Sequence, residues 1–254
     1  MSGNPSSQIS NLIDRLAHFL VRSRWSYLAI GFGFPLFWVA SLVCARYAPS
    51  FSLWLNQEDN WIENIQVVVL VIGLIMTVCL ARKLRRDNLK LWAVLYACFA
   101  LVIFFVAGEE ISWGQRIFGF STPQWFIQRN YQHEMNVHNF RSARPPVSFV
   151  RVGGPIILIA LSAAYAALGR ERTDKWRAYL YLPHPILIPL WTCYLSFSAI
   201  RPIYMATHPG KLRGPDVIAK LSEPAELIMY CGIVLFISMA LTRELPVERT
   251  PERH

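Results

Sequence analysis

The sequence predicts an all-α protein: a polytopic membrane bundle of about six transmembrane helices, with an N-terminal amphipathic helix and a short interfacial helix. Hydrophobic residues occupy 54% of the 254 positions and charged residues 16%. An ordinary soluble domain has about a quarter of its residues charged. The mean hydropathy is +0.32. Apolar runs of about 20 residues, enough helix to cross a hydrocarbon core of roughly 30 Å, alternate with short charged segments.

The predicted elements follow in order along the chain. Residues 1–25 contain apolar positions at helical spacing, such as Leu12, Leu16 and Leu20, which predict a cytoplasmic amphipathic helix on the membrane surface. Pro183 and Pro185 predict a kink around His184 in the inner half of the fifth run. The transmembrane domain, residues 26–242, contains six predicted spans, namely 26–45, 62–81, 91–107, 148–168, 178–200 and 225–242.

Basic residues set the predicted orientation. Lys and Arg are concentrated beside alternate span ends, notably in 82–90 and 170–177, and such residues favour the cytoplasmic side. This predicts a multi-pass protein of the bacterial inner (cytoplasmic) membrane with both termini in the cytoplasm. Residues 108–147 then form a periplasmic loop, and 243–254 a disordered cytoplasmic tail.

Composition also excludes some classes of function. The net charge of +9 comes mostly from residues beside the apolar runs, so it indicates membrane orientation and no nucleic-acid partner. All five cysteines lie inside apolar runs without paired spacing, which is typical of small core residues rather than of disulfides or zinc ligands.

Two adjacent acids end the third predicted span. Glu109 and Glu110 point about 100 degrees apart on a helix, so one can face the bundle while the other faces the interface. A helix C-terminus disfavours negative charge, and ionisable groups near membrane depth tend to mark functional sites. Both residues are therefore candidates for catalysis, and Glu110 is also a candidate metal ligand. The alternative is a pair of solvated carboxylates at a helix end.

A polar segment follows. Ser121, Thr122 and Pro123 predict the start of a short interfacial helix. If the helix continues, Glu134 and His138 lie one turn apart on one face, a spacing that suits two ligands of one metal ion, although a surface pair is the simpler interpretation.

Other polar residues of the same loop are candidates for substrate binding. Arg116 is suited to pairing with an acid or to holding a phosphate. Trp113 is also explained by the membrane interface, and neutral amides suit either a polar ligand or a loop network. The candidate substrate-binding residues are Trp113, Gln115, Arg116, Asn136 and Asn139.

Acids also begin the second and sixth predicted spans. Asp59 and Glu223 occupy positions typical of helix capping. Glu63 and Glu226, about one turn deeper, are better candidates for a metal site. The complete predicted ligand set is Glu63, Glu110, Glu134, His138 and Glu226.

The string GEEISWGQRIFG, with an N-x-Q-x-E-x-N-x-H-N pattern after it, resembles a group of uncharacterised bacterial multi-pass membrane proteins. The resemblance covers about residues 58–239. It implies membership of that group and supplies no activity.

Two functions are consistent with these observations. The first is an enzyme that acts on a membrane lipid or lipid-linked substrate at the periplasmic face, with a divalent metal that activates water. The second is a non-enzymatic transporter or membrane-complex assembly subunit, in which the acids bind cations or a basic partner surface. The sequence leaves the metal, the reaction and the oligomeric state open.

Overall fold

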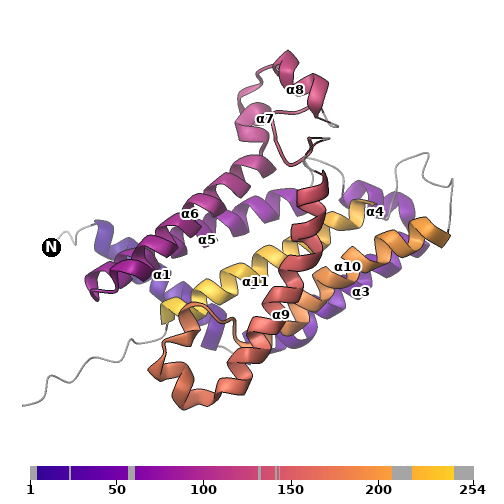
Figure 1. Ribbon diagram of the computed structural model, residues 1–254. Helices are drawn as coiled ribbons and strands as arrows, with labels where there is room; N and C mark the ends of the chain where they lie inside the picture. Colours follow the sequence, from indigo (N-terminus) through magenta and orange to yellow (C-terminus); the bar gives the residue numbers. More distant parts are fainter. Residues whose placement is uncertain are drawn as a thin grey trace, which may run out of the picture.

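The computed structural model describes residues 5–22, 24–56, 61–130, 133–140, 142, 144–207 and 219–242 (Figure 1). Within these ranges the regular structure is helical, and an isolated bridge between Asn130 and Phe140 is the one extended pairing. The predicted all-α class is confirmed. The predicted tail, 243–254, and the predicted capping residue Asp59 lie outside the described residues.

Five helical stretches in the described part of the chain are long and apolar enough to cross a membrane. Leu, Val and Phe side chains remain exposed along them, as expected of surfaces that face lipid. The five are Trp25–Tyr47, which joins α2 (Arg24–Leu28), a π-helical turn (Ala29–Gly33) and α3 (Phe34–Tyr47); α5 (Trp61–Arg86); α6 (Lys90–Glu110); Phe149–Gly169 within α9 (Arg144–Lys175); and α11 (Ser222–Thr242).

The predicted span 178–200 is wrong at its start. The structure has 3-10 turns at Ala178–Leu180 and Pro185–Leu187, and the helix proper, α10, runs over Ile188–Thr207. Pro183 and Pro185 end helical hydrogen bonding rather than merely bending the helix. His184 instead caps the second turn, because its Nδ1 accepts a hydrogen bond from the Ile186 N–H at 3.2 Å.

Helices α5 and α11 pack closely through small residues. A Cβ atom added at Gly73 of α5 would lie 2.9 Å from Val234 of α11, so glycine is required for this approach. On the other side of α11, Gly232 accommodates the Trp191 ring of α10, which would lie 2.5 Å from an added Cβ. Helix α11 thus contacts both α5 and α10. Helix α6 packs on α5 and α9 packs on α10, so α11 lies at the centre of the bundle (Figure 1).

The bundle has two chemically different ends. At one end α1 (Pro5–Arg22) packs against α11 and α5, and Lys83 donates to the Leu241 carbonyl at 3.0 Å. The first described helix and the last turn of α11 therefore share this end, which we call the α1 end. The other end collects the start of α5, the end of α6 and the start of α11 (Figure 1). It carries the acids, and we call it the acidic end.

Two short helices project from the acidic end beyond α6 (Figure 1): α7 (Gln115–Phe118) and α8 (Gln124–Arg129). Helix α8 starts close to the predicted position, with Pro123 at its N-cap and no side-chain capping bond. Apolar side chains cover this projection: Ile117 is 69% exposed and Phe118 is 78% exposed. Such a surface suits the predicted place at a membrane interface.

Candidate functional site

The backbone leaves helical geometry immediately after α6. Ser112, Trp113 and Gly114 have φ values of 46°, 55° and 80°, so three successive residues adopt left-handed conformations. For residues other than glycine this costs roughly 1–3 kcal/mol each. The Trp113 ring lies against Gly108, where an added Cβ would lie 3.0 Å from the ring carbons. The surrounding contacts must offset this strain.

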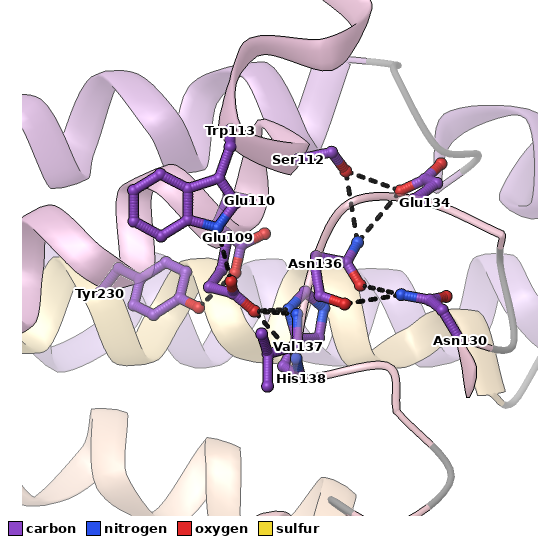
Figure 2. A network of polar contacts seen from close by, with 10 residues as sticks. All are labelled: Glu109, Glu110, Ser112, Trp113, Asn130, Glu134, Asn136, Val137, His138 and Tyr230. Carbon is purple, nitrogen blue, oxygen red and sulfur yellow. Dashed lines mark hydrogen bonds and ion pairs between the residues drawn. The ribbon is translucent and has the colours of Figure 1, made fainter. Parts of the chain in front are cut away.

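Glu109 supplies the main compensation (Figure 2). Its Oε1 accepts the indole N–H of Trp113 at 2.7 Å. Its Oε2 accepts the backbone N–H groups of Val137 at 2.6 Å and His138 at 2.9 Å. The residue is 4% exposed. Glu109 therefore ties the end of α6 to a loop 28 residues further along the chain, a role that sequence reasoning did not anticipate.

His138 contacts the same carboxylate. Its Nδ1 lies 3.3 Å from Glu109 Oε2, and its side chain is 42% exposed. Burial lowers the pKa of His138. The Glu109 contact and the charges of Glu110 and Glu226 raise that pKa by more than burial lowers it, so the net shift is upward. Because Nδ1 faces Glu109, Nε2 is the ring nitrogen that remains for a ligand or a proton.

A second set of contacts closes the loop (Figure 2). Ser112 Oγ donates to Glu134 Oε2 at 2.8 Å, and Asn136 Nδ2 donates to the same oxygen at 3.1 Å. Buried Asn130 donates to the backbone carbonyl and the side-chain oxygen of Asn136, each at 2.7 Å. We call Glu109, Ser112, Trp113, Asn130, Glu134, Asn136 and the backbone of Val137 and His138 the loop network.

The condition for the predicted Glu134–His138 spacing, a helix that continues through 133–138, is not met in the structure. Helix α8 ends at Arg129, Asn130 is extended, and His133 has a φ of 59°. Asparagine side chains that bond to nearby backbone compete with helical hydrogen bonding, and Asn130 does so here. Glu134 and His138 are therefore not one helical turn apart, and Glu134 belongs to the loop network rather than to a shared ligand pair.

The predicted substrate-binding residues mostly support the loop. Gln115 accepts the Met135 N–H at 2.9 Å and contacts Thr122 through its amide nitrogen. Trp113 and Asn136 serve the loop network, and Asn139 lies half-buried in the following turn. The side chain of Arg116 lies outside what the structure describes.

Glu110 faces a different set of partners. Its Oε1 accepts the Tyr230 hydroxyl of α11 at 2.7 Å (Figure 2). Glu63 of α5 and Glu223 of α11 lie close enough for their charges to act on Glu110, and Glu110 acts in turn on Glu226. The structure thus brings together four carboxylates from three helices, which we call the acidic cluster: Glu63, Glu110, Glu223 and Glu226.

Each of the two cluster glutamates on α11 has a partner on another helix. The Glu226 carboxylate accepts a hydrogen bond from the Arg151 guanidinium of α9 at 2.9 Å. Gln66 of α5 donates to the Glu223 carbonyl at 2.8 Å and approaches its carboxylate at 3.4 Å. Glu223, predicted as a capping residue, is thus part of the cluster.

Sequence reasoning missed Tyr230, Gln66 and the pairing of Arg151. A signal for Tyr230 was present, because Glu223, Glu226 and Tyr230 are spaced three and four residues apart and so share one helix face. No such local signal exists for Gln66 or Arg151, since their partners lie 157 and 75 residues away.

The predicted metal ligands are not assembled as a shell. In the part of the chain that the structure describes, no group of three or more His, Cys, Asp or Glu side chains is arranged to hold a metal ion. Glu134 is directed to Ser112 and Asn136, and Glu226 to Arg151.

Comparisons with known proteins give no matching family model, no similar curated protein and no similar solved structure. The geometry of the acidic end is therefore the basis for inferring what the chain does.

Proposed function

We propose that this chain is an integral membrane enzyme that acts on a lipid or lipid-linked substrate at the acidic end, with His138 as its acid–base group. The observation that carries the proposal is the contact of His138 Nδ1 with Glu109 Oε2 at 3.3 Å. In this proposal the acidic end faces the periplasm, as the distribution of Lys and Arg predicts.

The Glu109 contact has the form of a catalytic carboxylate–histidine pair. A carboxylate that holds Nδ1–H fixes the tautomer and orientation of the ring, leaves Nε2 to exchange a proton with substrate, and stabilises the imidazolium that forms. Glu109 is itself fixed by two backbone N–H groups and an indole. Burial lowers the pKa of His138, but the Glu109 contact and the neighbouring carboxylate charges together raise it by more, and the net rise favours the protonated ring that can act as a general acid.

The neighbouring charges favour one class of head group. Within the described residues, the four carboxylates of the acidic cluster interact with Arg151 and Lys220, and His138 is shared with Glu109. Carboxylates outnumber cations in this cluster, so a bound positive charge would gain partners there. We therefore favour a substrate whose head group carries an amine, such as an aminophospholipid or an amino-sugar lipid.

The test uses the full chain in vesicles. Protein is reconstituted into phosphatidylethanolamine–phosphatidylglycerol vesicles and into vesicles of the source cell's own lipid extract, and new lipid species are followed by mass spectrometry. His138→Asn keeps an N–H donor near Glu109 but cannot exchange protons, so product should form at least about 100-fold more slowly. His133→Asn, the same change five residues earlier in the loop, should leave the rate unchanged. Equal rates for the two variants would overturn the proposal.

The acidic cluster also supports the second function, a transporter or assembly subunit that binds cations. Four carboxylates that repel one another are the observation in its favour. Saturable Ca²⁺, Mg²⁺ or Zn²⁺ binding by calorimetry and elemental analysis, with unchanged lipids in every vesicle, would favour this function over the enzyme. A divalent metal in the enzyme stays a prediction that the same elemental analysis checks.

A further inference from the structure

A cavity of about 320 Å³ lies at the α1 end, far from the residues that carry the proposed function. Its walls come from α1, α2, α9, the irregular segment after α9, and the last turns of α11. Its lining residues include Val21, Tyr27, Tyr165, Tyr179, His184 and Thr242.

The lining combines aromatic rings with neutral polar groups. Tyr165 and His184 meet edge to face, with ring centroids 5.2 Å apart and planes at 65°. The Ile186 N–H holds the His184 ring by its Nδ1 at 3.2 Å. Together with Tyr179, these side chains give the cavity phenol and imidazole groups that can hydrogen-bond carbonyl or hydroxyl oxygens.

Charge distinguishes the cavity from the acidic end. Its described lining contains no Asp, Glu, Lys or Arg. An ionic head group placed here would lose water without gaining an opposite charge, which is costly. A neutral ligand avoids that cost.

Size and position indicate where the ligand comes from. At about 30 Å³ for each water in the liquid, 320 Å³ holds roughly ten groups of that size, enough for a substituted ring or a glycerol ester head but not for long chains. Helix α1 borders the cavity, and its Leu12 and Phe19 are 65% and 63% exposed, as suits a helix that contacts lipid. Chains of a bound lipid can therefore remain in the bilayer.

We propose that this cavity binds the head of a neutral membrane amphiphile that carries carbonyl or hydroxyl oxygens. Membrane quinones and diacylglycerols share this chemistry, and the experiment below distinguishes them.

The test measures the thermal stability of the detergent-purified full chain with decylubiquinone, with dioctanoylglycerol, or with a short-chain phosphatidylglycerol as the anionic control. At a hundredfold excess over Kd, a bound ligand should raise Tm by roughly 5 °C. The neutral ligand that gives a saturable rise identifies the source. No rise with either neutral ligand, or an equal rise with phosphatidylglycerol, would overturn the proposal.

Two variants locate the effect. Val21→Trp fills the cavity and should abolish the rise in Tm, whereas Val43→Trp, the same change at a half-exposed position on α3, should keep it. His184→Phe keeps a flat ring but removes the hydrogen-bonding nitrogens, and should weaken binding about tenfold. A rise that persists in Val21→Trp, or full affinity in a folded His184→Phe, would show that the ligand binds elsewhere.

Discussion

Glu109 and Glu110 are adjacent in sequence and belong to two regions of opposite character. Glu109 lies in the loop network, where each carboxylate oxygen meets fixed N–H donors. Glu110 lies in the acidic cluster, where a tyrosine hydroxyl is the hydrogen-bond donor that reaches it in the described chain and three further carboxylates act on its surroundings. The comparison shows that satisfied hydrogen bonds mark a carboxylate that positions other groups, and that carboxylates in excess of cations mark a candidate for binding. Four experiments test this difference.

The largest effect is expected for Glu109→Ala. The change leaves the Trp113 indole and the Val137 and His138 N–H groups without their acceptor, and it removes the compensation for the left-handed turn at Ser112. We expect a loss of about 3 kcal/mol in the free energy of unfolding. Thermal unfolding in detergent measures it. If Tm stays within a degree of the wild-type value, the loop network does not stabilise the fold.

A smaller loss is expected for Gly108→Ala, because the new methyl group would lie 3.0 Å from the Trp113 ring. Overpacking of this kind costs roughly 1–3 kcal/mol. Gly31→Ala is the matched control, since nothing lies within 4 Å of an added Cβ there. Similar Tm values for the two variants would indicate that Trp113 moves freely and does not support Glu109.

Glu110→Gln should change the stability in the opposite direction. Glutamine keeps a hydrogen-bond acceptor for Tyr230 and removes one charge from a repelling set. We expect the free energy of unfolding at neutral pH to be unchanged or to increase by up to about 1 kcal/mol, so the variant should be at least as stable as the wild type. The same variant should lose cation or amine affinity. Destabilisation comparable with that of Glu109→Ala would remove the distinction between the two acids.

The smallest effect concerns pH. The His138 pKa is raised by its contact with Glu109, so the stabilisation from this pair is complete below the unfolded pKa of about 6.5 and is lost as pH rises through the folded pKa. The side chain is 42% exposed, so the contribution should stay under about 1 kcal/mol. The Tm difference between wild type and His138→Asn should therefore shrink from pH 6 to pH 9. A difference that grows with pH would contradict the assigned pair.

Run length and composition predicted most of the scaffold. Helices α5, α6 and α11 cover the predicted runs because about 20 apolar residues leave a helix as the structure that satisfies the backbone in lipid. The fifth run started too early, since hydropathy does not register the two prolines around His184 that stop helical bonding.

The site was less accessible from sequence for a physical reason. The loop network joins Glu109 to Val137 and His138, and the acidic cluster brings together residues of α5, α6 and α11. Both therefore depend on tertiary contacts rather than on local spacing. Residue type still marked the acids, because carboxylates beside apolar runs are costly wherever the chain folds. It could not distinguish Glu109 from Glu110, whose partners come from different segments.

The apolar projection formed by α7 and α8 affects the direction of approach to the acidic end. Ile117 and Phe118 are too exposed to face water without cost, so we expect the projection to rest in the head-group layer beside α6. A molecule that diffuses within the bilayer would then reach Glu110 and His138 sideways, without crossing the aqueous phase. Lateral entry would discriminate by membrane solubility before any hydrogen bond is made.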